Sequence, residues 1–301
     1  MNSSYANLVD RRQGNSLSRT GLCPVYRLLS TRIGGTPLNA IALVKHVPDT
    51  AQLSSAMDGL RLMAEGPRII NPWDEYAVEE CLNLKEAHGG QVTVLSLGPA
   101  EAAEALKQGL AMGADQAVLL SDPAFEGGDT LATARALAAA VAKIGDWDIV
   151  IAGRSSLDGE SAQTAIQVAA LLDVPQLTYV ARIREIDFEA KTITVERMLE
   201  GGREVLTSKL PCVVSVVKEI NEPRYPSFIG IRKAAKATIP TWTADDLGLD
   251  AATIGAAASG VQWPEISLPP ARESECEIIA GDSPEAIATA LVDKLMAEKI
   301  I

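Results

Sequence analysis

The chain has 301 residues, of which 47% are hydrophobic and 22% are charged, so it can bury the core of one large domain or two small ones. Its formal net charge of −12 and its aromatic content of 4% argue against nucleic-acid binding, which needs a basic face and aromatic stacking platforms. Four widely spaced cysteines and only two histidines argue against a metal site and against a Cys-x-x-Cys redox motif.

Residues 1–38 differ in composition from the rest of the chain and are expected to lie outside the main fold. Up to Pro37 they contain five arginines, many serines and a single acid, Asp10. An organellar transit peptide has this composition, but an ordered or disordered extension or a misplaced start codon would explain it equally well. No apolar run reaches the roughly 18–20 residues of a membrane helix, so no membrane insertion is expected. The expected location is the cytoplasm, or the mitochondrial matrix if this segment is a transit peptide.

From residue 39 onward, short apolar runs alternate with stretches of helical periodicity. The runs expected to form buried strands are Ile41–Val47, Gln91–Leu97, Gln116–Leu120 and Trp147–Ala152. The stretches expected to form helices are Trp73–Ala87, a segment from Pro99 to near Gly113, and a segment capped by Asp129 or Thr130 that ends near Lys143. Strand and helix thus alternate repeatedly, which predicts an α/β fold with a mainly parallel, doubly wound sheet.

The pattern then changes to that of an antiparallel insertion. Leu177–Ile186 and Thr192–Leu199 alternate apolar and polar residues around a polar turn, and Glu204–Ser208 adds a third short strand. Cys212–Val217 again has the composition of a buried parallel strand.

The last part of the chain is expected to be less regular. Three prolines and the basic run Arg232–Lys236 indicate an exposed irregular segment, and 241–272 lacks periodicity, as an arm or linker would. Ser283–Lys299 has apolar residues at helical spacing and is expected to form a final amphipathic helix. We therefore divide the chain into an α/β domain at 39–240 and a C-terminal arm with a helix at 241–301.

The segment from Ile149 to Thr164 is the strongest candidate for chemistry. It leaves a buried strand, passes a loop with Gly153 and Gly159, and enters a helix. Ligands of open α/β sheets bind beyond the carboxyl ends of strands, and free N–H groups at a helix start favour an anion such as phosphate. The hydroxyl groups that could add hydrogen bonds are those of Ser155, Ser156, Ser161 and Thr164. A plain loop with Ser161 as helix N-cap explains the pattern equally well, and the motif is neither a Walker nor a Rossmann pattern.

Two further segments are candidates for binding. Asn71-Pro72 begins the first long helix at the same sheet edge, where Asn71 either caps the helix or contacts an adenine nucleotide. The proline-restricted segment after the last strand presents Arg224, Tyr225 and Phe228, which suit partner docking, although an ordinary connection with a buried phenylalanine is also consistent. No Ser/His/acid arrangement or carboxylate pair indicates catalysis.

Several motifs together resemble the β (small) subunits of electron-transfer flavoproteins, from about residue 39 to the C-terminus. They are Val44-Lys-His-Val-Pro-Asp49, Asn71-Pro-Trp-Asp-Glu-Tyr-Ala-Val-Glu-Glu80, Gly98-Pro-Ala100, Ala111-Met-Gly-Ala-Asp115, Asp158-Gly-Glu-Ser-Ala-Gln163 and Asn221-Glu-Pro-Arg-Tyr225. The resemblance implies an adenine-nucleotide α-hydrolase-like fold. It also implies a heterodimer in which the α subunit holds most of the FAD and the C-terminal arm of this chain contacts that subunit. The chain would then be an electron carrier rather than a stand-alone catalyst.

The resemblance also implies a set of binding residues. AMP would be held by the loop residues Gly153, Arg154, Ser155, Ser156, Leu157, Asp158, Gly159, Ser161, Ala162, Gln163 and Thr164, with help from Leu43, Asn71 and Leu97. Trp73 lies at the position near the flavin, whereas Thr50 replaces a tyrosine that some members place there. Phe228 corresponds to the apolar anchor for acyl-CoA dehydrogenases of fatty acid β-oxidation, and electrons would pass to an acceptor such as a quinone oxidoreductase.

Three other functions are consistent with parts of the sequence. Bifurcating relatives, including those linked to nitrogen fixation, bind a second FAD in place of AMP and oxidise NADH, and Asp158–Gln163 resembles their loops as well. A stand-alone ATP-binding module of the universal-stress type would share the sheet but not the Pro-Arg-Tyr segment. A nucleotide-dependent ligase or hydrolase would need a pyrophosphate loop after the first strand, where Lys45–Asp49 does not provide one.

Overall fold

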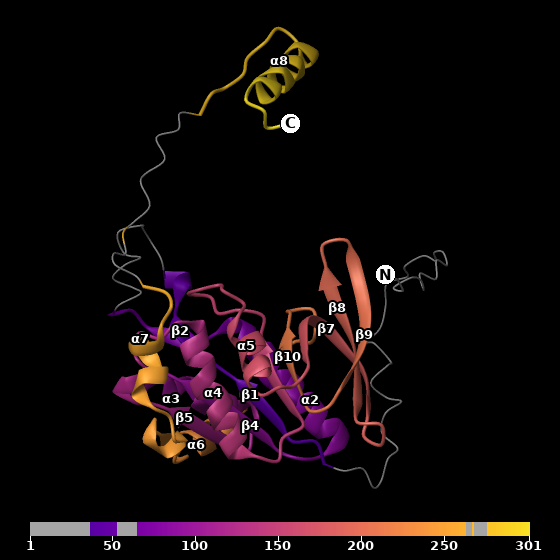
Figure 1. Ribbon diagram of the computed structural model, residues 1–301. Coiled ribbons are helices and arrows are strands. Elements are labelled where there is room, and N and C mark those ends of the chain that lie inside the picture. Colours follow the sequence, from indigo (N-terminus) through magenta and orange to yellow (C-terminus); the bar gives the residue numbers. More distant parts are fainter. Residues whose placement is uncertain (1–36, 53–64, 263–266, 268–275) are drawn as a thin grey trace, which may run out of the picture. The chain divides into compact units, whose positions relative to one another are not determined.

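The computed structural model describes residues 37–52, 65–262, 267 and 276–301, which fall into two compact units (Figure 1). The larger unit comprises Met1–Asp49 and Gly66–Gln262, and the smaller comprises Thr50–Glu65 and Trp263–Ile301. The predicted N-terminal extension lies almost entirely outside the described residues. None of the described helices is long and apolar enough to cross a membrane.

One nine-stranded sheet forms the centre of the larger unit, in the order β11-β5-β4-β1-β6-β10-β7-β8-β9. All pairs from β11 to β7 are parallel. These strands are β1 (Ala40–Leu43), β4 (Val92–Leu97), β5 (Gln116–Leu120), β6 (Ile149–Gly153), β7 (Gln176–Asp187), β10 (Cys212–Val216) and β11 (Thr241–Trp242). The predicted mainly parallel sheet is confirmed.

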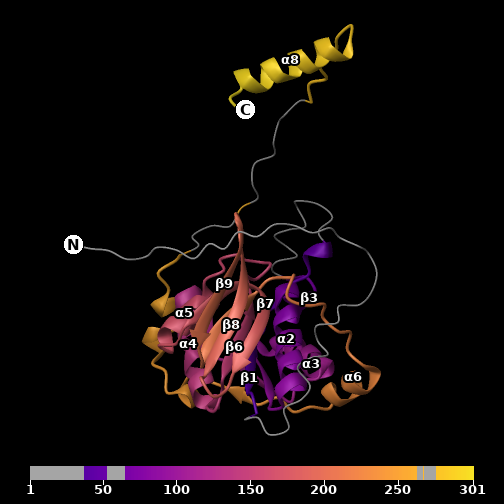
Figure 2. The ribbon, with the colours of Figure 1, turned by 90° about the vertical axis from the view of Figure 1, so that its right-hand side faces the viewer.

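Helices cover both faces of this sheet (Figures 1 and 2). α2 (Pro72–His88) and α3 (Ala103–Met112) contribute to one core cluster, and α4 (Thr130–Ile144) and α5 (Thr164–Leu171) contribute to another on the opposite face. Successive residues of a strand therefore alternate between the two clusters, as Ile149 and Val150 do. The doubly wound arrangement that the sequence predicts is confirmed.

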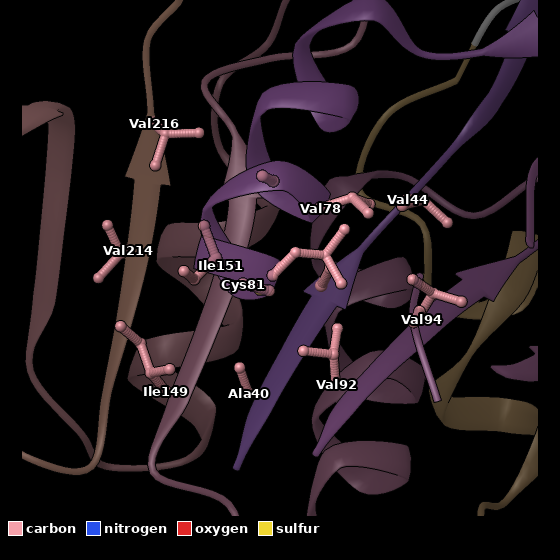
Figure 3. Packing of buried hydrophobic residues seen from close by; sticks show 14 of the residues in the cluster. Ala40, Val44, Val78, Cys81, Val92, Val94, Ile149, Ile151, Val214 and Val216 are labelled. Carbon is pink, nitrogen blue, oxygen red and sulfur yellow. The ribbon is translucent and has the colours of Figure 1, made fainter. Parts of the chain in front are cut away.

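The core beneath α2 shows how the apolar runs are used. Val78 and Cys81 of α2 lie over Ile149 and Ile151 of β6 and Val92 of β4 (Figure 3). All five side chains have 0% exposure, and complete burial of a valine or isoleucine contributes roughly 1.5–3 kcal/mol. This packing holds the middle of α2 against the central strands.

The antiparallel insertion is also confirmed. β7 pairs with β8 (Thr192–Leu199), and β8 pairs with β9 (Gly202–Lys209), both in antiparallel fashion. Glu196 on β8 is buried between Arg184 of β7 and Arg203 of β9, whose guanidinium groups lie 2.6 and 2.5 Å from its carboxylate. These two partners lower the pKa of Glu196 and connect all three strands.

The first predicted strand, Ile41–Val47, is wrong in its extent. β1 ends at Leu43, and a separate short strand β2 (His46–Pro48) pairs with β3 (Arg68–Ile70) in a second, antiparallel sheet. Between them, the N–H of Lys45 donates to the Asp74 carboxylate and its carbonyl accepts from Asn71 N–H. These bonds to α2 and its N-cap residue turn the chain away from the large sheet at Lys45.

The chain after β10 contains more regular secondary structure than expected. The segment with the basic run contains a helix, α6 (Phe228–Ala234), whose N-cap Ser227 accepts from Gly230 N–H. Beyond residue 240, β11 pairs with β5, and Ala244 and Ile254 are buried, so the larger unit continues to Gln262. The remaining short helices are η2 (Thr50–Gln52), η3 (Ala100–Ala102), η4 (Pro123–Phe125), η5 (Asp245–Leu247), η6 (Ala251–Thr253) and α7 (Gly255–Ala258). Such brief elements leave no recognisable periodicity.

The smaller unit contains the predicted C-terminal helix, α8 (Pro284–Ala297), which is confirmed. Ser283 caps it by accepting from Ala286 N–H, and Lys294 pairs with Glu277. None of its residues is buried, and Leu291 and Met296 are 45% and 59% exposed.

Gly230 tests how closely α6 must approach α3. A Cβ at this position would lie 2.2 Å from the carbonyl oxygen of Ala111 in α3. We expect Gly230→Ala to lower the free energy of unfolding by about 1–3 kcal/mol, because backbone must move to relieve the overlap. Urea denaturation measures this, and Gly201→Ala is the control, since nothing lies within 4 Å of a Cβ there. Equal stability of the two variants would contradict the close packing of α6.

Candidate functional site

The candidate site lies at the point where the strand order of the sheet reverses. The chain proceeds outward from β1 through β4 to β5 and then returns to β6, which pairs with the opposite side of β1. Ligands of open α/β sheets bind beyond the carboxyl ends of the strands at such a point. The segments that meet there are Val44-Lys45 after β1 and the loop after β6, residues 153–164, which we call the 153–164 loop.

Asn71 attaches the start of α2 to this loop. Its side-chain Nδ2 donates to the carbonyl of Ser155 at 2.9 Å, and its Oδ1 accepts from Leu157 N–H at 3.0 Å. Asn71 occupies the N-cap position of α2 but makes no side-chain capping bond. The interpretation of Asn71 as a helix cap is therefore wrong, because both ends of its amide are used to hold the loop.

Asp74, in the first turn of α2, joins the ends of two central strands. Its carboxylate accepts from Lys45 N–H at 2.8 Å and from Gly153 N–H at 3.2 Å. The residue is 6% exposed, and burial raises its pKa to about 7 despite the hydrogen bonds of Asn71, Lys45 and Gly153. A Cβ at Gly153 would lie 2.6 Å from both Asp74 Oδ1 and the backbone of Trp73, so glycine is required here.

An ion pair bridges the same two strand ends from outside. Lys45 Nζ lies 2.8 Å from both carboxylate oxygens of Asp158. Partial burial raises the pKa of Asp158. The Lys45 ammonium and the Ser156 hydroxyl lower it by more, so the pKa lies below its ordinary value. Asp158 is consequently held as a carboxylate facing Lys45.

Arg154 provides a cation with unused hydrogen-bonding capacity. Its guanidinium carbon lies 4.4 Å from the centre of the Trp73 ring, a cation–π geometry, and its backbone N–H donates to Val216. Its buried Nε has no hydrogen-bond partner within the part of the chain that the structure describes. An unpartnered guanidinium N–H beside a helix start is suited to an anionic ligand.

The second half of the loop has a strained backbone. Glu160 and Ala162 adopt left-handed conformations with φ of 44° and 54°. Gln163, not Ser161, occupies the N-cap position of α5, and it makes no side-chain capping bond, so the assignment of Ser161 as N-cap is wrong. The first N–H groups of α5 therefore receive no side-chain cap, which leaves them suited to an anion.

The structure brings the predicted nucleotide residues to one edge. Leu43 and Leu97 end β1 and β4, Thr164 begins α5, and Trp73 lies beside Arg154. Ser155, Ser156, Leu157 and Ala162 are half-buried in the loop, whereas Gly159, Ser161 and Gln163 are exposed. Among the described residues, no group of His, Cys, Asp or Glu side chains could hold a metal ion.

The three predicted docking residues separate into two groups. Arg224 is bound to α2, because its Nε and Nη2 lie 2.8 and 2.9 Å from the Glu79 carboxylate and its Nη1 lies 2.5 Å from Glu86. These two glutamates raise its pKa. By contrast, Tyr225 and Phe228 are 96% and 75% exposed, so the phenylalanine does not pack into the core.

Sequence reasoning missed Asp74 and Glu79 as partners of these segments. An acid in the first turn of a helix is ordinarily explained by the helix dipole, which gave no reason to single out Asp74. Their partners are 79 residues away for Asp74 and Gly153, and 145 for Glu79 and Arg224. The one signal in the sequence is Gly153, because a glycine at the end of a buried strand indicates that another segment, here α2, approaches closely.

Comparisons with known proteins identify relatives over most of the chain. The family model described as electron transfer flavoprotein domain matches residues 59–247. The electron transfer flavoprotein subunit beta of Thermoanaerobacterium thermosaccharolyticum is 43% identical over 266 residues, which cover 88% of this chain and 100% of that protein. Protein FixA of Bradyrhizobium diazoefficiens is 39% identical, with 86% of this chain and 91% of that protein covered. The caffeyl-CoA reductase-Etf complex subunit CarD of Acetobacterium woodii is 40% identical, covering 88% and 100%.

Proposed function

The chain belongs to the electron transfer flavoprotein family as a β subunit, and from this premise we propose that it binds AMP in the 153–164 loop and clamps an FAD-bearing α subunit. The observation that carries the AMP site is the buried Nε of Arg154, which has no partner among the described residues and lies in the loop that leads to the uncapped start of α5, at the point where strand order reverses. The hydroxyl groups of Ser155 and Ser156 can add hydrogen bonds to a phosphate.

The residues of this chain would prepare the site for electron transfer without covalent chemistry. FAD, held largely by the α subunit, would supply the one-electron transfers. Trp73 would face the flavin, and the Arg154 cation above its ring would favour negative charge there. Bound AMP would hold together the loop segments that follow several strands, including the loop that Asn71 supports. It would thereby stabilise the subunit by mass action.

Nucleotide content tests this proposal directly. The protein is purified as the heterodimer with its α subunit, the nucleotides are released with acid, and they are separated by chromatography. One FAD and one AMP per heterodimer are expected for a single-flavin carrier. A stable protein that carries neither nucleotide and does not associate with the α subunit would overturn the proposal.

A second FAD in place of AMP is the second candidate. The similarity to protein FixA and to a subunit of a caffeyl-CoA reductase-Etf complex favours it, together with the resemblance of Asp158–Gln163 to loops of bifurcating relatives. Two FAD and no AMP in the same chromatogram would decide for this candidate, and NADH oxidation would then be the activity to assay.

Docking of flavin dehydrogenases would use the exposed apolar surface of α6. This surface, which we call the apolar surface of α6, consists of Phe228 and Ile229 of that helix and Tyr225 of the segment before it, and Ile229 is 80% exposed. Acyl-CoA dehydrogenases of fatty acid β-oxidation or similar enzymes are the proposed donors, and a quinone oxidoreductase is the proposed acceptor. The exposed apolar side chains of α8 would contact the α subunit, and the bacterial relatives support a cytoplasmic location.

Phe228→Ala tests the docking surface. We expect the apparent KM of a donor dehydrogenase for this carrier to rise at least about tenfold, because a central aromatic anchor typically contributes about 2 kcal/mol or more to binding. Steady-state reduction of the carrier by that dehydrogenase measures the effect. Leu199→Ala, which removes a 48%-exposed apolar side chain from β8, is the control. Equal KM values for both variants would exclude Phe228 as an anchor.

A further inference from the structure

We propose that Asp74 is the positioning residue of the nucleotide site, where it holds the 153–164 loop against the end of β1. This inference rests on the proposed nucleotide-binding function. Asp74 Oδ2 accepts from Lys45 N–H and its Oδ1 accepts from Gly153 N–H. These two N–H groups belong to the last residue of β6 and to the segment after β1, the pair of strands between which the order of the sheet reverses.

The chemistry of the bridge requires a carboxylate of this length. Both strand ends offer N–H donors, so the bridging group must accept with each of its two ends. An asparagine has only one acceptor oxygen and would direct its NH₂ group at the second N–H. A glutamate would need space for an additional methylene between α2 and Gly153, where even a Cβ added at Gly153 would lie only 2.6 Å from Asp74 Oδ1 and from Trp73.

The surroundings of Asp74 link it to the rest of the loop. Its charged neighbour is the Lys45 ammonium, which pairs with Asp158, and its polar neighbour is Asn71, which holds Ser155 and Leu157. Gly153 directly precedes Arg154, whose guanidinium lies on Trp73. A shift of the Gly153 backbone would therefore move the start of the 153–164 loop and, with it, Arg154 and its unpartnered Nε.

Burial of this carboxylate indicates a positional role. Taking a carboxylate out of water is costly unless it is well bonded, and the pKa near 7 reflects that cost. Because the folded-state pKa lies above the ordinary value of 3.8, the stability that Asp74 contributes is present below pH 3.8 and lost as pH rises through about 7. A side chain needed only for packing would not carry this penalty.

Asp74→Asn in the heterodimer tests the inference. After removal of bound nucleotide, calorimetric titration with AMP is expected to give at least about tenfold weaker affinity, since each bond to a charged group contributes roughly 1.5–3 kcal/mol, which corresponds to at least tenfold. Hydrogen exchange should accelerate at Lys45 and Gly153–Leu157, while the FAD content of the complex and exchange elsewhere in the sheet stay unchanged. The fall in stability between pH 4 and 7 should also diminish.

Asp115→Asn is the matched control, because Asp115 likewise accepts from a strand N–H, that of Val92, at 2.8 Å. It should leave AMP affinity and exchange at Lys45 and Gly153 unchanged. If wild-type protein binds no AMP or other adenine nucleotide, the proposed function fails. If wild-type protein binds AMP and Asp74→Asn binds it equally well, or loses protection uniformly across the sheet, Asp74 is not the positioning residue.

Discussion

Gly153→Ala is expected to abolish nucleotide retention and to lower the free energy of unfolding by about 2–4 kcal/mol. A Cβ there would meet the Trp73 backbone and side chain and the Asp74 carboxylate, each at 2.6 Å, well inside van der Waals contact. Neither side can yield easily, because β6 is paired with β1 and β10 while α2 is packed on the core. Overpacking at one such site typically costs about 1–3 kcal/mol, and loss of the Asp74–Gly153 bond adds to it.

Chromatographic nucleotide content and urea denaturation of the heterodimer measure the two effects. Gly201→Ala is the control outside the loop, because nothing lies within 4 Å of a Cβ there. We expect this control to retain nucleotide and stability. A Gly153→Ala complex with full nucleotide content would show that α2 and β6 can separate without cost to the site, which would contradict a role for their close contact.

The central sheet could be predicted from sequence because local signals and tertiary environment agree there. Gln116–Leu120 and Thr192–Leu199 have the predicted bounds, since an apolar or alternating run is delimited at each end by turn residues. Buried parallel strands need continuous apolar runs, and amphipathic helices between them need a 3.6-residue period, so both are visible within a short window.

Elements that depend on distant partners could not be predicted in this way. Lys45 lies within an apolar run that continues the strand pattern, and the chain turns there because α2 supplies Asp74 and the Asn71 N–H. β11 is two residues long and exists because β5 offers an unpaired edge. Neither signal is contained in the segment itself.

The candidate site shows the same division. Its location could be predicted, because glycines and hydroxyl residues after a buried strand have a local physical meaning. The roles of Asn71 and Arg224 could not, since each is decided by partners on another element. Asn71 holds a loop 84 residues away rather than capping its own helix, and Arg224 faces α2 rather than solvent.

Arg224→Ala is the second substitution expected to have a large effect, on stability and on docking together. Glu79 is 7% exposed and would lose its bidentate partner, which costs about 3–5 kcal/mol for a fully buried pair. Because Arg224 itself is 33% exposed, solvent would offset part of this cost, and we expect a loss of about 2–3 kcal/mol in urea denaturation. The segment that carries Tyr225 and Phe228 would lose its attachment to α2.

The effect of Arg224→Ala on docking distinguishes an ion pair that positions the docking segment from one that only stabilises the fold. Without the bond between Arg224 and Glu79, the segment that carries the apolar surface of α6 would lose conformational entropy when it binds. The KM for the donor dehydrogenase should therefore rise even with Phe228 intact. Arg232→Ala, an exposed cation on α6 without an ion pair among the described residues, is the control for charge alone. In a double-mutant cycle, Glu79→Gln combined with Arg224→Ala should cost less than the sum of the two, because each partner is costly mainly when the other remains. Additive losses would mean that Arg224 and Glu79 act independently and that α2 does not position the docking surface.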